Sequence, residues 1–362
     1  MSENNLTSIT LDRALTLVDL IPDRLPIIFL GPPGIGKTEG LKDKCIKHGA
    51  RLVPKLATTL EATDFAGIPY ADGPVTDWKV PNFIYDCSTM AAKEYQGPAW
   101  LFIDEITSAT EEVQKACLKW MHERTDGRTI MRDNVRWIFA GNRVDDRVGA
   151  TSMLKTFSSR CVTFNIRADA ESFTNWGRDN NIHPHIIAFI RTFPDKIMTF
   201  DPNSEDPSFA CPRSYHAVSD IISGLKAEPS GYYEVLAGTI GAGVARQLLA
   251  YIKQAEKCIA PEDICKNPSG VKLPAPNELD ILHATVSSLE SYVRSHHKHW
   301  KSALTYAERI LPELGIVLAM GLFEVFHKHM KVEDKRDVIK SKEFNSAMDK
   351  WRDYMKGIYA QN

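Results

Sequence analysis

Eight consecutive residues near the N-terminus have the types and spacing of a phosphate-binding loop. They follow the apolar run 27–30 and match G-x-x-x-x-G-K-[ST]: Gly31, Pro32, Pro33, Gly34, Ile35, Gly36, Lys37 and Thr38. Glycines here let backbone N–H groups turn inward toward phosphate oxygens, and a following helix adds its positive N-terminal end. Lys37 should then reach the β- and γ-phosphates of a nucleotide, and the Thr38 hydroxyl should bind Mg²⁺.

A pair of carboxylates follows a second apolar run, residues 101–103. Ligands of a parallel sheet bind at the carboxyl ends of its strands, so we expect Asp104 and Glu105 to face the loop. Asp104 should hold Mg²⁺, mostly through water, and Glu105 should polarise an attacking water. The alternative is that the pair is only a polar strand end followed by a helix start.

A third apolar run, residues 135–140, ends in Gly141 and Asn142. We place its strand between the strand that leads into the loop and the strand that carries Asp104. The Asn142 amide would then hydrogen-bond the attacking water or the γ-phosphate. Asparagine after a strand is also common turn chemistry, and that alternative stays open.

The elements that must position these residues alternate between strand and helix patterns in the first half of the chain. Strands are predicted at 27–30, 51–57, 100–103, 135–140 and 161–166, in a parallel sheet covered by helices on both faces. Ser108 and Glu111 match a capping box at the start of a helix whose apolar stripe runs from Val113 to Met121. The second half is helical in period. We predict an α/β nucleotide-binding domain at 1–168, an all-α lid at 169–260 and a C-terminal helical extension at 261–362.

Composition narrows the function classes. The chain has 362 residues, of which 43% are hydrophobic and 25% charged, so collagen-like and wholly disordered proteins are excluded. A net charge of -2 gives no global attraction to nucleic acid or to an anionic membrane. The seven cysteines contain no C-x-x-C pair, which favours a reduced protein over a disulfide or zinc scaffold. The N-terminus lacks signal-peptide features, so a cytoplasmic location without membrane association is expected.

In this order and spacing, the loop, Phe102–Glu105 and Ala140–Asn142 resemble the Walker A, Walker B and sensor 1 elements of AAA+ ATPases. Residues 63–69 look like the segment before the helix-2 insert of MoxR-type members. Ser159-Arg160 is similar to the arginine-finger position, and Cys211-Pro212-Arg213-Ser214 to sensor 2. The resemblance covers roughly residues 10–255, and residues 256–362 match no assigned motif.

The resemblance implies an ATP- and Mg²⁺-dependent P-loop ATPase that assembles as a homo-oligomer, a hexameric ring, with nucleotide at the subunit boundaries. Arg160 would reach into the neighbouring site and stabilise transition-state charge, and Arg213 would contact the γ-phosphate from the lid. Arg143 and Arg147 are nearby alternatives for the finger. The motor would remodel a protein client, and MoxR-type members commonly act with proteins that carry a von Willebrand type A domain.

One segment departs from the family pattern. Residues 64–86 are rich in proline, and we predict neither a clear insert hairpin nor an aromatic pore loop there. Trp78 and Tyr85 are expected to be packed aromatic residues, because most large aromatic side chains are largely buried. Threading of a polypeptide through a pore is therefore not predicted.

Three other functions compete with the motor: a P-loop kinase acting on a small molecule, a nucleic-acid motor related to clamp loaders or restriction translocases, and a non-hydrolysing scaffold. Glu105 and Asn142 argue against the scaffold, and the near-neutral charge argues weakly against nucleic acid. The sequence contains no pattern that indicates the acceptor pocket of a kinase. Residues 142–145 are similar to the guanine-binding N-K-x-D pattern, but Asp-Glu-Ile-Thr stands where such proteins carry D-x-x-G, which favours adenine.

Overall fold

The computed structural model of the protein describes residues 7–91, 95–126, 128–143, 146, 153–224, 229–255 and 258–359. These residues form two compact units, which we describe separately. Unit 1 takes in residues up to 172 together with 198–205 and 211–213, and unit 2 takes in 173–197, 206–210 and the chain from 214 onward. The three predicted domains, and with them the division of the helical half at residue 260, stay a prediction.

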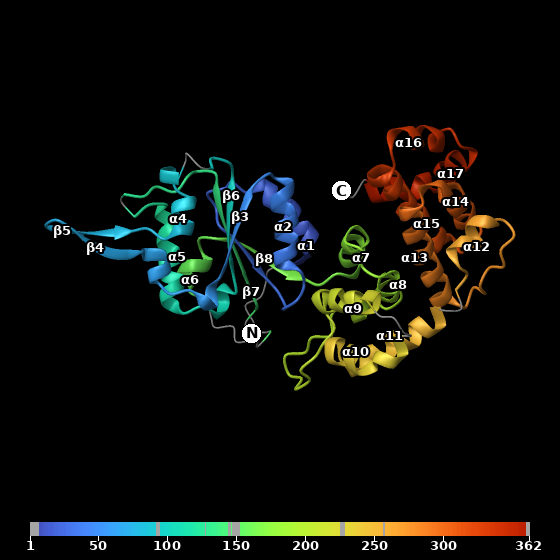
Figure 1. Cartoon of the computed structure of the whole chain (residues 1–362), viewed down its shortest axis with the longest axis horizontal. Coiled ribbons are helices and arrows are strands. Elements are labelled where there is room, and N and C mark those ends of the chain that lie inside the picture. Colours follow the sequence, from blue (N-terminus) through green and yellow to red (C-terminus); the bar gives the residue numbers. More distant parts are fainter. Residues whose placement is uncertain are drawn as a thin grey trace. The chain divides into compact units, whose positions relative to one another are not determined.

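Unit 1 is built on a six-stranded sheet in which all neighbouring strands run parallel (Figure 1). Its strands are β1 (Ser8–Thr10), β2 (Ile27–Leu30), β3 (Arg51–Leu56), β6 (Ala99–Asp104), β7 (Val135–Gly141) and β8 (Val162–Arg167). Their order is β1-β8-β2-β7-β6-β3, so β7 lies between β2 and β6, as predicted. β1 was not predicted, because three residues are too few to show a strand pattern.

Helices cover both faces of the sheet (Figure 1). One face carries α1 (Leu11–Leu17) and α2 (Lys37–Lys47). The other carries α3 (Thr63–Ala66), α4 (Asn82–Asp86), α5 (Glu111–Glu123) and α6 (Lys155–Ser158). Along β2, Ile27 and Phe29 face the first layer and Ile28 faces the second, because side chains alternate along a strand. Strands buried on both faces read as continuous apolar runs, which is why the sequence predicted this α/β P-loop fold correctly.

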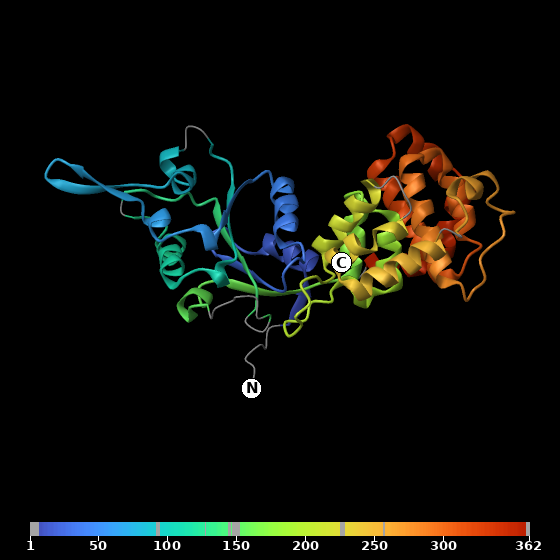
Figure 2. The ribbon, with the colours of Figure 1, turned by 60° about the horizontal axis from the view of Figure 1, so that its bottom comes forward.

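A β-hairpin between α3 and α4 corrects one prediction. β4 (Ile68–Asp72) and β5 (Val75–Lys79) form an antiparallel pair that extends away from the rest of unit 1 (Figure 1 and Figure 2). The sequence predicts no hairpin here, because its strands are short and carry a proline that hides the alternation. The prediction for the two aromatic residues is also wrong: Trp78 is 49% exposed and Tyr85 is 37% exposed.

The start of α5 differs slightly from its prediction. Thr110, rather than Ser108, is the N-cap, and its side chain accepts a hydrogen bond from the Val113 N–H at 3.4 Å. Residues 106–108 form a separate 3-10 turn that delays the helix. The apolar stripe is confirmed, since Val113, Trp120 and Met121 are buried. The indole N–H of Trp120 also donates to the Phe65 carbonyl at 2.8 Å and ties α5 to α3, just before the hairpin.

The rest of the described chain is helical, as predicted. Its helices are α7 (Ala170–Asp179), α8 (Pro184–Thr192), α9 (Pro212–Gly224), α10 (Tyr233–Ile240), α11 (Ala242–Ala255), α12 (Pro261–Lys266), α13 (Leu279–Ser295), α14 (Trp300–Ala307), α15 (Pro312–His329), α16 (Val332–Ile339) and α17 (Lys342–Tyr359). An apolar core joins α12 through α17 around Leu289, Trp300 and Leu318. Within the described residues, every helix is too short or too polar to cross a membrane.

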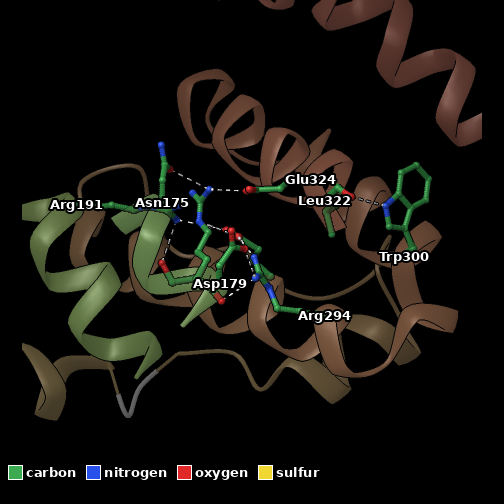
Figure 3. Close-up of polar contacts among 10 residues, drawn as sticks. Asn175, Asp179, Arg191, Arg294, Trp300, Leu322 and Glu324 are labelled. Carbon is green, nitrogen blue, oxygen red and sulfur yellow. Dashed lines mark hydrogen bonds and ion pairs between the residues drawn. The ribbon is translucent and has the colours of Figure 1, made fainter. Parts of the chain in front are cut away.

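A cluster of buried charges also holds unit 2 together (Figure 3). At its centre is Glu290 on α13, which is only 3% exposed. It pairs with Arg178 of α7 at 2.9 Å, with Arg191 of α8 at 3.5 Å and with Arg294 at 3.7 Å. Arg178 also pairs with Glu324 at 3.3 Å, and Arg294 also pairs with Asp179 at 3.2 Å. The consecutive helices α7 and α8 therefore meet α13 and α15, which lie about 100 residues or more further along the chain, at one balanced set of charges.

Candidate functional site

The loop between β2 and α2 has the backbone shape of a phosphate cradle. Gly34 and Gly36 both have positive φ, at 76° and 92°, and Gly36 is the N-cap of α2. Gly34 is required for a second reason, because a Cβ there would lie 2.5 Å from the Cys211 Sγ. The first N–H groups of α2 are left without helical partners and carry the positive end of the helix dipole. The loop can therefore receive an anion.

Lys37 is buried inside this loop. Its ammonium group donates to the Gly31 carbonyl at 2.8 Å and to the Pro32 carbonyl at 3.0 Å. Burial lowers the pKa of Lys37 from 10.5 to about 8, and the carboxylates of Asp104 and Asp146 partly oppose this effect. Among the described residues, the hydrogen-bond partners of this ammonium group are neutral carbonyls, and the two carboxylates offset only part of the cost of burying its charge. A bound phosphate would supply the missing negative charge.

Thr38 and Asp104 meet at the carboxyl edge of the sheet. The Thr38 hydroxyl donates to the Asp104 Oδ2 at 2.8 Å, although the two residues are 66 positions apart. Both side chains present oxygen atoms, which are the ligands that Mg²⁺ prefers. A magnesium ion held here would take its remaining ligands from water and from phosphate oxygens. The donor set of these two residues therefore fits the ion that the sequence predicts.

Glu105 follows Asp104 in a strained conformation. Its φ is 56°, in the left-handed region that costs a residue with a side chain about 1–3 kcal/mol. Such strain persists where the surroundings over-determine it, and it is concentrated at functional sites. The carboxylate is exposed and accepts a hydrogen bond from the Thr58 hydroxyl at 3.4 Å. Thr58 follows β3, which pairs with β6 in parallel, and the sequence analysis missed it.

Asn142 lies at the same edge, two strands away from β3. Its backbone N–H donates to the Thr107 hydroxyl at 3.1 Å, so the turn after β7 is tied to the turn after β6. The Gly141 position allows this approach, because a Cβ there would lie 2.6 Å from the Thr107 Oγ1. The order of β2, β7 and β6 places Asn142 between the residues that follow Leu30 and those that follow Ile103. Thr107 is a second positioning residue that the sequence analysis missed.

Arg213 also lies beside the loop. Its backbone N–H donates to the Gly34 carbonyl at 3.0 Å, and its Nε is 3.6 Å from the place where a Gly34 Cβ would stand. The Arg213 side chain is exposed. The segment 211–213 belongs to the same compact unit as the loop. The predicted sensor 2 arginine is therefore next to the predicted phosphate site.

The three arginines considered as fingers differ in their surroundings. Arg160 follows α6, is exposed and donates to the Thr156 carbonyl at 2.6 Å. Arg143 is partly buried and pairs with Asp146 at 3.0 Å. Arg147 lies outside the described residues, as do Val144 and Asp145 of the N-K-x-D-like pattern.

Comparisons with known proteins add little to this geometry. No protein-family model matches the chain, and no curated protein matches it. Among solved structures, it is similar to a protein from Cytophaga hutchinsonii that is provisionally designated an ATPase. That likeness covers 85% of this chain and 78% of the other, with 14% identity and a TM-score of 0.34. A likeness at this identity and TM-score gives no information about function.

Proposed function

We propose that unit 1 binds ATP together with Mg²⁺ and hydrolyses it to ADP and phosphate. The observation that carries this proposal is the meeting of the buried Lys37 with the Thr38–Asp104 pair and the strained Glu105 at one edge of a parallel sheet. Ligands of such sheets bind at this edge. A scaffold that only bound nucleotide would not need the strained, exposed carboxylate of Glu105 beside the Thr38–Asp104 pair.

Each residue has a distinct task in this proposal. The loop N–H groups and Lys37 bind the phosphates, and Thr38 and Asp104 would hold Mg²⁺. When bound, that ion neutralises negative charge on the phosphate oxygens. Glu105 orients the attacking water and accepts its proton, while Asn142 fixes the water or the γ-phosphate by a hydrogen bond.

A finer proposal follows the resemblance to AAA+ ATPases of the MoxR type. We propose that the chain works as a ring-forming motor, a hexamer, that remodels a protein client, with a von Willebrand type A domain protein as the candidate class. Three observations support it: Arg213 lies beside the loop, Arg160 is exposed, and a hairpin begins at Ile68, within the segment 63–69 that resembles the one before the family's insert. The near-neutral net charge gives no support to a nucleic-acid partner.

The ATPase proposal is tested by comparing the wild-type protein with Lys37→Ala. We expect the wild type to bind ATP in calorimetric titration and to release phosphate in the presence of Mg²⁺. Lys37→Ala should lose both, because the buried cation is the main charge partner of the phosphates. A matched control is Lys42→Ala on the exposed side of α2, where the lysine pairs with Glu39. Phosphate release by Lys37→Ala at the wild-type rate would overturn the proposal.

The ring proposal is tested by the solution mass of Glu105→Gln with and without ATP and Mg²⁺. A variant that binds ATP without cleaving it should hold its subunits together by linkage. We expect a shift to about six times the 40.6 kDa chain. A chain that binds ATP and stays monomeric would contradict the ring and leave the ATPase proposal standing.

A further inference from the structure

Arg143 is held in a fixed orientation just after β7. Its Nε donates to the Asp146 Oδ2 at 3.2 Å, and its Nη2 donates to the Asp146 Oδ1 at 3.0 Å. The backbone N–H of Arg143 also donates to the Asp146 Oδ2, at 3.0 Å. This forked pairing uses the planar geometry of both groups and is among the strongest that proteins make. Asp146 therefore determines where the guanidinium points.

The burial of the pair distinguishes it from an ordinary surface ion pair. The Asp146 side chain is 8% exposed, whereas the Arg143 side chain is 28% exposed. Surface pairs between neighbouring residues contribute little and are easily exchanged for water. Here the carboxylate is the buried partner, and the guanidinium is the partner that stays partly exposed to solvent. The guanidinium therefore remains accessible to a ligand.

The Arg143 side chain extends across the start of the phosphate loop. In the sheet, Leu30 of β2 is paired with Gly141 of β7 on one side and with Asn165 of β8 on the other. The Arg143 Nη1 reaches to the Asn165 Oδ1 at 3.5 Å, so the side chain crosses the end of β2 where the loop begins. The Gly31 N–H donates to the Gly141 carbonyl at 3.2 Å and holds the two turns together.

The charge of Arg143 is also felt at the centre of the loop. After burial, the largest influences on the pKa of Lys37 come from Asp104 and Asp146, which raise it, and from Arg143 and Arg213, which lower it. Lys37 and Arg143 are thus two cations near the same small volume. Asp146 keeps the second cation in place while no anion is bound.

We propose that Arg143 contacts the terminal phosphate of ATP bound in its own subunit, and that Asp146 is the positioning residue that aims it. This inference rests on the proposed ATP site and deepens it. It removes Arg143 from the candidates for a finger that acts on a neighbouring subunit. It also predicts that the site prefers a triphosphate to a diphosphate because of a residue at the end of β7.

The test compares the affinity for the β,γ-methylene analogue of ATP with the affinity for ADP, by titration calorimetry on the full-length chain. Arg143→Ala should weaken analogue binding by about tenfold or more, the size expected for a lost charge-assisted hydrogen bond, and should change ADP binding by less than about twofold. Arg143→Lys should recover part of the preference. Asp146→Asn should shift it in the same direction, and the double variant should add no further loss.

A matched control is Arg167→Ala, which removes an arginine paired with an aspartate at the end of β8, the strand on the other side of β2. It should leave the ratio of the two affinities unchanged. Equal weakening for analogue and ADP in Arg143→Ala would mean that the pair only supports the loop, and would overturn the inference. A wild-type protein that binds neither ligand would instead contradict the proposed function itself.

A second readout separates action within a subunit from action between subunits. Arg143→Ala subunits mixed with Lys37→Ala subunits should show no recovery of ATP hydrolysis, because neither kind has a complete site. Recovery in the mixture would assign Arg143 to the neighbouring site and overturn the proposed placement.

Discussion

Replacing Glu290 by glutamine should lower the stability of unit 2 strongly, although the two side chains have nearly the same shape. The substitution keeps the volume of the side chain and removes one negative charge from the buried cluster. Three arginines surround this carboxylate, each with a side chain between 11% and 15% exposed. Arg191 depends on it most, because its other guanidinium contact within the described part of the chain is with the neutral Ser287 hydroxyl, at 3.4 Å.

The magnitude follows from burial. Removing one partner of a buried ion pair leaves an uncompensated charge and costs about 3–5 kcal/mol, whereas an exposed pair is worth about 0–1 kcal/mol. Glu290 belongs to the first class and Glu324, whose side chain is 24% exposed, lies closer to the second. We therefore expect Glu290→Gln to destabilise the region by about 3 kcal/mol or more. Glu324→Gln, the matched control, should cost about 1 kcal/mol.

The assay is hydrogen exchange of the native full-length chain, followed by mass spectrometry of peptides from α13 and α15. A loss of about 3 kcal/mol in local opening free energy speeds exchange by about 100-fold. The α2 and α5 peptides of unit 1 serve as an internal reference and should be unchanged. Equal exchange in the two variants, or a stabilised Glu290→Gln, would mean that the buried charges do not hold the four helices together.

Two further predictions concern the finger and the response to acid. Arg160→Ala should keep ATP binding and lose hydrolysis, and mixing it with Lys37→Ala subunits should restore some phosphate release; no recovery in a demonstrably mixed oligomer would count against Arg160. Burial lowers the pKa of His183 from 6.5 to about 4, so the unfolded chain binds its proton first and the free energy of unfolding falls as pH drops from about 6.5 to 4. The loss should reach about 2–3 kcal/mol in urea unfolding. It should be smaller in His183→Asn, which keeps the acceptor at the start of α8, and an unchanged loss would contradict the assignment.

The sheet and the phosphate loop could be predicted from the sequence because their signals are local. A strand buried on both faces is a short apolar run, and a loop that needs positive φ at two positions uses glycine there, as Gly34 and Gly36 do. The position of β7 between β2 and β6 was also predicted, and the sheet order confirms it. The roles assigned to Asn142, Arg160 and Arg213 stay predictions.

The residues that the sequence analysis missed are defined by contacts across long separations. Thr58 meets Glu105 over 47 positions, and Thr107 meets the Asn142 backbone over 35. A lone threonine in a turn gives no sign of its distant partner. Asp146 could not be predicted for another reason. It comes directly after residues 142–145, whose similarity to a guanine-binding motif involves Asp145 and gives no role to Asp146.

The hairpin and the buried charges of unit 2 show the same limit. Short strands with a proline do not display the alternation that marks a hairpin, and Trp78 looks like a core residue until the structure leaves it exposed. Glu290 reads as an ordinary polar position on a helix. Its burial becomes visible only when α7, α8 and α15 are placed around α13.

Steady-state phosphate release decides whether Glu105 takes the proton of the attacking water. It is measured for the wild type and for Glu105→Gln, each with ATP affinity measured on the same sample. We expect Glu105→Gln to bind ATP within about threefold of the wild type and to hydrolyse it about 100- to 10,000-fold more slowly, since the variant keeps the phosphate cradle and loses the group that takes the proton. Equal hydrolysis in the two proteins, or a wild type that binds ATP and never releases phosphate, would contradict it.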